Sequence, residues 1–188
     1  MRKIIFQSSI SLDGFIEGPN GELDWFIRDE EASDVAEFLS DFDTIFYGRK
    51  TYEKMGVQEF MEPDLRAVEK EFLYILHGMR KYVFSRQKKH VSGNAMVVGR
   101  DLESEVLRIR EEEGKNIWLR GGADILRTFA DLDLVDEYLL IMHPVVLSSG
   151  KPLFWGMKKP LYLKLIRERN LKSGVVILHY KPESRMKK

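Results

Sequence analysis

The sequence contains no cysteine, and this absence removes three kinds of chemistry at once. Disulfide bonds, thiolate nucleophiles and cysteine-based zinc sites all require a thiol. No uninterrupted apolar run reaches the roughly 18 residues typical of a transmembrane helix. Thirty lysine and arginine residues balance thirty aspartate and glutamate residues, so no net charge favours nucleic acid or an anionic membrane as a partner. We therefore expect a cytoplasmic protein that binds neither.

The 188 residues and the 44% apolar content suit one compact domain over residues 1–188, without a linker or an internal repeat. Short apolar runs alternate with stretches of helical period in the first two thirds of the chain. We expect strands over residues 3–10, 44–47, 81–85, 95–99 and 116–120, and helices over 31–40, 49–55, 64–79, 102–113 and 124–130. The last third contains strand patterns over 137–147, 161–166 and 174–180, with no long helix between them.

Alternating strands and helices predict an α/β fold in which a mostly parallel sheet carries helices on both faces. The strand-rich end predicts an antiparallel edge on the same sheet. Sheets of this type bind ligands beyond the carboxyl ends of their strands, where loops lead into helices.

Three junctions of this kind carry residues suited to phosphate groups. The first is the strand TIFY followed by Gly-Arg-Lys-Thr at 48–51, where a glycine, two cations and a hydroxyl precede a helix. The second is Ser85-Arg86 after YVF, and the third is Gly121-Gly122 between NIWLR and the next helix. Each motif by itself also fits an ordinary turn. None is a G-x-G-x-x-G fingerprint, which disfavours a standard dinucleotide-binding Rossmann domain.

Taken together, the motifs SLDGFIE, YGRKTYE, VFSR, GGA and HPVVLSSGKPLF resemble the dihydrofolate-reductase-like family. The resemblance is greatest to the C-terminal reductase domain of bifunctional riboflavin-biosynthesis deaminase/reductase proteins and their stand-alone bacterial relatives, and it covers nearly the whole chain. It implies a three-layer α/β fold, a homodimer and NADPH as cofactor. It places the cofactor phosphates, including the adenosine 2′-phosphate beside Ser85 and Arg86, on Gly48, Arg49, Lys50, Thr51, Ser85, Arg86, Gly121, Gly122 and Ala123.

On the substrate side, Asp13 best matches the family pattern and is the candidate catalytic carboxylate, although a structural turn-cap explains it equally well. The segment Gly14–Trp25 corresponds to the mobile loop over the nicotinamide in dihydrofolate reductases, and a plain hairpin turn would use the same residues. We expect substrate contacts from Asp24 and Trp25 in this segment and from Glu31 and Asp34 in the following helix. For Trp25, a place in the core is the alternative. For the two helix carboxylates, a solvated acidic face is the alternative.

The resemblance implies an NADPH-dependent reductase, with 5-amino-6-(5-phosphoribosylamino)uracil of the riboflavin pathway as the family's substrate. That pathway's reductases tend to have a lysine in the first strand and an acidic residue before the double glycine, and here these positions are Gln7 and Arg120. Dihydrofolate reduction and a non-catalytic NADP(H)-binding sensor are the alternatives. The zinc deaminase activity of the bifunctional relatives is excluded, because it needs a P-C-x-x-C motif. The four histidines lack metal-ligand spacing, and His143 before Pro144 suits the positioning of a loop better than metal binding.

Overall fold

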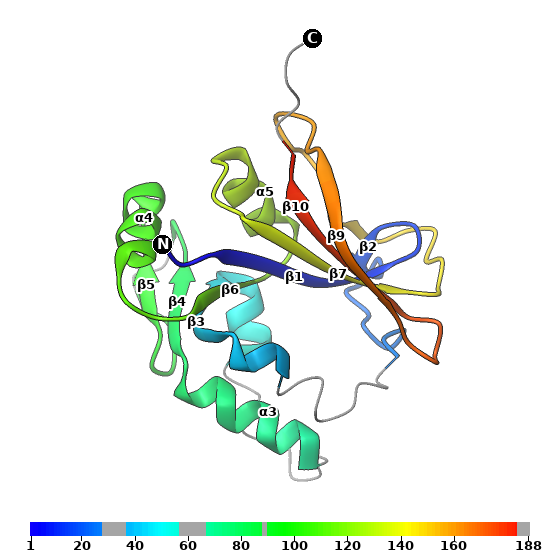
Figure 1. The fold of residues 1–188 in the computed structure, drawn as a ribbon, viewed down its shortest axis with the longest axis horizontal. Coiled ribbons are helices and arrows are strands. Elements are labelled where there is room, and N and C mark those ends of the chain that lie inside the picture. Colours follow the sequence, from blue (N-terminus) through cyan, green and yellow to red (C-terminus); the bar gives the residue numbers. More distant parts are fainter. Residues whose placement is uncertain (28–36, 57–66, 88–89, 184–188) are drawn as a thin grey trace. The chain divides into compact units, whose positions relative to one another are not determined.

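The computed structural model describes residues 1–27, 37–56, 67–87 and 90–183 (Figure 1). The chain divides into two compact units. The first comprises residues 1–3 and 29–121, and the second comprises residues 4–28 and 122–188.

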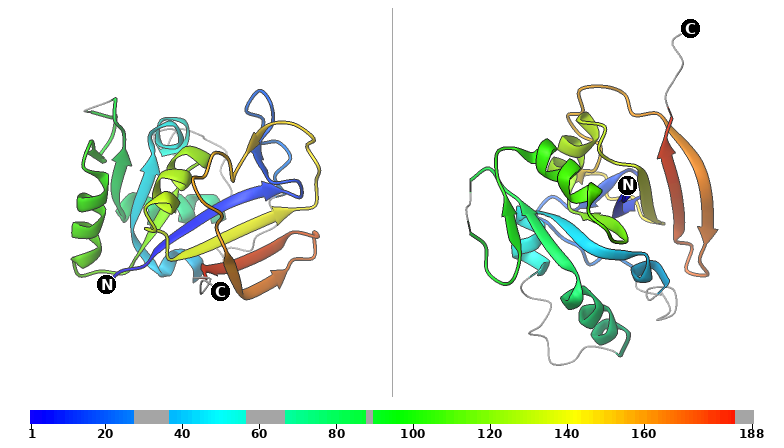
Figure 2. Two further views of the ribbon diagram at one scale, coloured as in Figure 1. Left: turned by 90° about the horizontal axis from the view of Figure 1, so that it is seen from above. Right: turned by 60° about the vertical axis from the view of Figure 1, so that its left-hand side comes forward.

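The first unit is built on four parallel strands in the order β5-β4-β3-β6. Strand β3 is rich in β-branched and aromatic residues, and Ile45, Phe46 and Tyr47 are fully buried. Helices α3 and α4 pack on opposite faces of these strands (Figures 1 and 2). The chain crosses from β3 to β4 and from β5 to β6 in opposite directions, so right-handed crossovers require a helix on each face. The elements are β3 (Phe42–Gly48), β4 (Arg80–Phe84), β5 (Met96–Val98), β6 (Asn116–Arg120), α3 (Ala67–Gly78) and α4 (Leu102–Glu111).

The second unit has four strands in the order β1-β7-β10-β9, with β1 parallel to β7 and β10 antiparallel to both of its neighbours. Helix α5 buries Ile125, Leu126 and Phe129, and the short strands β2 and β8 pair antiparallel beside the main sheet. The elements are β1 (Ile4–Ser11), β2 (Phe15–Glu17), α5 (Ala123–Asp131), β7 (Glu137–His143), β8 (Lys151–Pro152), β9 (Leu163–Asn170) and β10 (Val176–Pro182). The antiparallel C-terminal strands predicted from the sequence are thus confirmed.

Two expected elements differ in detail from the structure. The segment after β3 is not one regular helix, because a single α-helical turn, α2 (Arg49–Thr51), passes into a π-helical turn, Tyr52–Gly56. Strand β9 shows alternating leucines in the sequence, but seven of its eight residues are exposed. A strand at the edge of a sheet has a neighbour on one side alone, so alternation there does not guarantee burial.

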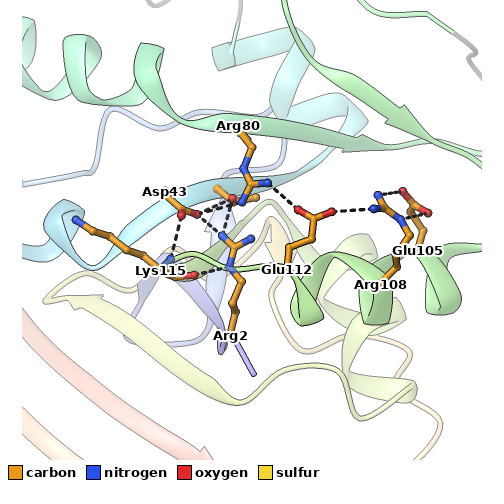
Figure 3. A network of polar contacts seen from close by, with 8 residues as sticks. Arg2, Asp43, Arg80, Glu105, Arg108, Glu112 and Lys115 are labelled. Carbon is orange, nitrogen blue, oxygen red and sulfur yellow. Dashed lines mark hydrogen bonds and ion pairs between the residues drawn. The ribbon is translucent and has the colours of Figure 1, made fainter.

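A chain of charged side chains holds together the amino ends of the strands in the first unit (Figure 3). Arg2 has a side chain that is 3% exposed and pairs with Asp43, and it also donates to the Thr44 hydroxyl at 2.7 Å. Asp43 accepts the backbone N–H of Lys115 at 2.9 Å. Arg80 continues the network to Glu112 at 2.7 Å. Burial lowers the pKa of Arg2, and the adjacent Asp43 carboxylate opposes that shift.

We predict that Asp43→Asn lowers the free energy of unfolding by about 3 kcal/mol, because it leaves the buried Arg2 guanidinium without its counter-charge. The Arg2→Met, Asp43→Asn double variant removes both charges and should lose less than the sum of the two single variants. Urea denaturation of the four proteins measures this difference.

The matched control for this prediction is Arg108→Ala, which breaks the outer part of the same network. Arg108 is 56% exposed and pairs with Glu105 at 2.6 Å. Its loss should cost less than about 1 kcal/mol, as for other exposed ion pairs. Equal effects of Asp43→Asn and Arg108→Ala would contradict the central role of the buried pair.

Candidate functional site

Parallel pairing brings the three predicted junctions to one edge of the first unit's sheet. Strand β3 lies between β4 and β6, and the register pairs Gly48 with Phe84 and Tyr47 with Arg120. The residues that follow each strand therefore leave the sheet at the same edge, the carboxyl edge, where α/β sheets bind ligands. Gly48–Thr51, Ser85-Arg86 and the turn that begins at Gly121 all start there.

At the first junction, Gly48 has an extended backbone with φ −67° and ψ 138°, a conformation open to any residue. The backbone angles at this position therefore do not require glycine. What glycine supplies is the absence of a side chain where the chain enters α2. Arg49 forms an ion pair with Glu53 at 2.7 Å, whereas Lys50 is exposed. Thr51 is half-buried.

Tyr52 connects this junction to the loop between β4 and β5. Its ring is 1% exposed and lies edge-on to Tyr47, with centroids 5.3 Å apart. Its hydroxyl donates to the carbonyl oxygen of Ser92 at 2.7 Å. Burial raises the pKa of this phenol, which keeps the hydroxyl protonated as a donor. The sequence analysis did not predict this role, because a tyrosine inside the helix expected over residues 49–55 gives no indication of a partner near residue 92.

At the second junction, Ser85 is buried and Arg86 is exposed. The backbone N–H of Ser85 donates to the carbonyl of Val98 at 3.0 Å, and its Oγ accepts the backbone N–H of Gln87 at 3.3 Å. Ser85 thus shapes the turn, and Arg86 presents its charge to solvent at the carboxyl edge.

At the third junction, Gly122 is the N-cap of α5, and its carbonyl accepts the N–H of Leu126 at 3.2 Å. Its φ of −89° is again available to any residue. A side chain at this position would approach the Ile16 Cδ1 atom to 3.2 Å and the Lys151 Nζ atom to 3.7 Å. An alanine at this position would therefore require the end of the Ile16 side chain to shift by a few tenths of an ångström. The first turn of α5, beginning at the buried Ala123, leaves backbone N–H groups available to an anion.

Asp13 binds the loop between β7 and β8 in the second unit. Its carboxylate accepts the Ser11 hydroxyl at 2.6 Å and the backbone N–H groups of Leu147 at 3.2 Å and Ser148 at 2.8 Å. Ser148 has a φ of 64°, a left-handed conformation that a non-glycine residue rarely adopts. The hydrogen bond from Ser11 is the main cause that lowers the pKa of Asp13, and the two backbone donors add to it. This is the geometry of the turn-cap alternative.

His143 at the end of β7 holds the segment that contains Trp25. The ring is 2% exposed, and its Nδ1 accepts the backbone N–H of Ile27 at 3.2 Å. It stacks on Phe26 and lies edge-on to Trp25, with centroids 5.4 Å apart in both pairs. The interpretation of His143 as a loop-positioning residue is confirmed. Because Nδ1 accepts a hydrogen bond, the ring proton must reside on Nε2.

The expected loop Gly14–Trp25 is partly regular. Its residues Phe15–Glu17 form β2 and pair with β8, and a turn follows in which Gly21 donates to the carbonyl of Gly18 at 3.0 Å. Gly14 and Gly21 both have a φ of 87°. Asp24 is exposed and Trp25 is half-buried, with its Nε1 donating to the carbonyl of Glu22 at 3.1 Å. The predicted substrate residues Glu31 and Asp34 lie outside the described residues.

Two further features are absent from the described part of the chain. No group of three or more His, Asp or Glu side chains there is arranged to hold a metal ion. No helix among the same residues is both long and apolar enough to cross a membrane.

Comparison with known proteins identifies the family. The family model of the RibD C-terminal domain matches residues 2–177. The uncharacterized protein YyaP of Bacillus subtilis (strain 168) is 42% identical over 181 residues, which cover 95% of this chain and 94% of that protein.

Solved structures show the same fold at low identity. A putative riboflavin biosynthesis protein from Shewanella sp. PV-4 matches with a TM-score of 0.77 at 20% identity, over 98% of this chain and 100% of that one. Dihydrofolate reductase from Enterococcus faecalis, solved with NADP(H), matches with a TM-score of 0.65 at 14% identity, over 97% of each chain. The α/β, dihydrofolate-reductase-like fold predicted from the sequence is confirmed, and the chain belongs to the RibD C-terminal domain family.

Proposed function

We propose that this protein is an NADPH-dependent reductase that transfers a hydride to a small heterocyclic or carbonyl-like substrate. The observation that carries the proposal is the arrangement of three phosphate-suited junctions on the neighbouring parallel strands β4, β3 and β6. Membership of the RibD C-terminal domain family supports the same conclusion.

The residues at the carboxyl edge fit the charges and the bulk of a dinucleotide. Gly48 and Gly121 carry no side chain, and Gly122 precedes the first turn of α5 with its unpaired N–H groups, so phosphate oxygens can approach the backbone. Thr51 adds a hydroxyl and Lys50 an exposed cation. In this proposal Arg86 binds the adenosine 2′-phosphate, because its guanidinium is exposed beside the buried Ser85. Arg49 is already neutralised by Glu53 and contributes less.

The nicotinamide, when bound, supplies the hydride. The chain's own contribution is to hold the cofactor and the acceptor carbon in register, which is most of what a hydride transfer requires from a protein. We assign Asp13 a positioning role through the loop at 147–148, and we retain Asp24 and Trp25 as substrate contacts.

The riboflavin-pathway pyrimidine is the finer candidate substrate, by analogy with the family. Gln7, a half-buried residue in β1, and Arg120 depart from the residue types expected for it. These departures favour a related but different acceptor, and they also keep a non-catalytic NADP(H) sensor as the competing function.

The proposal is tested first by binding and then by turnover. NADPH should raise the Tm of the protein more than NADH does, because bound ligand stabilises the folded state. NADPH oxidation is then followed with the riboflavin-pathway pyrimidine, with dihydrofolate and with a carbonyl panel. Binding without turnover on any of them would favour the sensor. No thermal response to either cofactor would overturn the reductase and the sensor together.

We predict that Arg86→Ala raises the Kd for NADPH at least tenfold, with about 1.5–3 kcal/mol expected from one charge-assisted hydrogen bond. The Kd for NADH should not change, because NADH lacks the 2′-phosphate. Isothermal titration with both cofactors measures the difference. Lys172→Ala removes an exposed cation in the turn between β9 and β10 and serves as the control. If Arg86→Ala weakens both cofactors equally, Arg86 does not read the 2′-phosphate.

We predict that Asp13→Asn lowers the Tm by a few degrees at pH 7, because it weakens the hydrogen bonds to Leu147 and Ser148. The pKa of Asp13 lies below its ordinary value of 3.8, so its stabilising effect is present above that pH and is lost as the pH falls through the folded-state pKa. The difference between the two proteins should therefore shrink as the pH falls from 7 through the folded-state pKa of Asp13, below which both side chains are neutral.

Glu183→Gln is the matched control, since Glu183 is an exposed carboxylate at the end of β10. Thermal unfolding of the three proteins across this pH range provides the measurement. A Tm difference for Asp13→Asn that does not depend on pH would show that the ionised carboxylate is not what holds the loop.

A further inference from the structure

The antiparallel pairing of β2 with β8 places a lysine beside the beginning of α5 in the second unit. Glu17 on β2 lies opposite Lys151 on β8. The two backbones approach closely at Gly150, where a Cβ atom would overlap the carbonyl oxygen of Glu17. Gly150 also has a φ of 142°, a conformation that residues with a side chain rarely adopt. The backbone before Lys151 is therefore held against β2, and Lys151 is held with it.

The ammonium group of Lys151 lies next to Gly122, the N-cap of α5. A Cβ atom on Gly122 would be 3.7 Å from Lys151 Nζ and 3.2 Å from the Ile16 Cδ1 atom. Ile16 reaches this point from the place where the register of β2 with β8 shifts, between Phe15 and Glu17. An apolar side chain and an ammonium group thus flank the start of α5.

The ammonium of Lys151 has a distant partner. Its ion pair with Glu17 spans 3.6 Å, which is longer than a hydrogen bond, and its side chain is 34% exposed. Among the residues that the structure describes, Nζ donates no hydrogen bond. The N–H groups of the ammonium can therefore turn to a ligand, since an ammonium has three donors and no acceptor.

The beginning of α5 adds positive potential at the same point. Backbone N–H groups of the first turn make the amino end of a helix partly positive, so a cation there is unfavourable unless an anion lies nearby. No side-chain hydrogen bond from the N-cap satisfies this end. Asp124, the acidic residue of the first turn, is 66% exposed and lies 3.6 Å from Arg127. An anion with several oxygen atoms would bind the ammonium and the backbone N–H groups together.

We propose that Lys151 binds the pyrophosphate of the nicotinamide cofactor, and that Glu17 is its partner while no cofactor is bound. This inference rests on the proposed function, and neither residue is among those predicted from the sequence. The pyrophosphate carries more negative charge than a single carboxylate, so the ammonium exchanges Glu17 for the cofactor on binding. Glu17 therefore competes with the cofactor for Lys151.

The first test compares Lys151→Met with the wild type by isothermal titration of NADPH and of NADH. Both Kd values should rise about tenfold, because both cofactors contain the pyrophosphate and the variant loses one charge-assisted hydrogen bond. Arg86→Ala should differ, since it weakens the binding of NADPH alone. Lys151→Arg should keep most of the affinity, because it keeps the charge. Lys164→Met removes an exposed cation of β9 and is the control that should leave both Kd values unchanged.

The second test uses Glu17→Gln, which removes the competing carboxylate. Both Kd values should fall about two- to fivefold, as expected from the loss of a partly exposed ion pair. Lys151→Met breaks the same ion pair, so a pair that serves only to hold β2 against β8 would make both variants bind more weakly. The double variant Glu17→Gln, Lys151→Met should bind as weakly as Lys151→Met, because Glu17 acts through the lysine.

The outcomes separate this inference from the proposed function. If neither cofactor binds the wild-type protein, both fail. If NADPH binds and Lys151→Met changes neither Kd by more than about twofold, or if Glu17→Gln does not lower them, the inference alone is overturned. A rise in the Kd of NADPH without a rise for NADH would assign Lys151 to the 2′-phosphate and would also overturn it. If Lys151→Met folds poorly, the sign of the change in Glu17→Gln still decides.

Discussion

The parallel pairing of β3 with β4 on one side and β6 on the other is the constraint on which the candidate site depends. Because the three strands run in one direction, every loop that follows them leaves at the carboxyl edge, and every loop that precedes them enters at the amino edge. The two edges use charge differently. At the amino edge, Arg2 and Asp43 neutralise each other and hold the strands together. At the carboxyl edge, Lys50 and Arg86 are exposed to solvent, as the proposed cofactor site requires.

The order of strands and helices was predictable because it depends on local patterns. Apolar runs, helical periods and glycines placed most elements within a few residues of their bounds, and the junctions at 48–51, 85–86 and 121–123 followed from them. The reason for the glycines was not predictable. Gly48 and Gly122 have ordinary backbone angles, and at Gly122 a side chain would approach Ile16 to 3.2 Å. That approach joins residues more than a hundred positions apart in the chain.

Long-range contacts likewise explain what the sequence could not show about Asp13, Tyr52 and β9. The carboxylate of Asp13 meets backbone groups at 147 and 148, and the hydroxyl of Tyr52 meets a carbonyl at 92. No sequence motif could identify these partners, because they make the contacts through backbone atoms and not through their side chains. The leucines of β9 have the alternation of a half-buried strand, and the exposure of seven of its eight residues follows from the position of β9 at the end of the strand order. His143 was the exception, since its place before Pro144 at a strand end suggested a role in positioning a loop.

The arginines of this protein differ chiefly in what holds them, and this difference bears on function more directly than their positions in the sequence. A guanidinium paired with a carboxylate, as in Arg2 with Asp43 or Arg49 with Glu53, attracts a further anion only weakly because the carboxylate already neutralises its charge. Arg120 lies among aromatic rings, with its Cζ 5.1 Å from the ring centroid of Trp118, and aromatic faces orient a guanidinium without removing its charge. Desolvation beside buried rings also strengthens its attraction for an incoming charge, since the effective dielectric constant is lower there than in water.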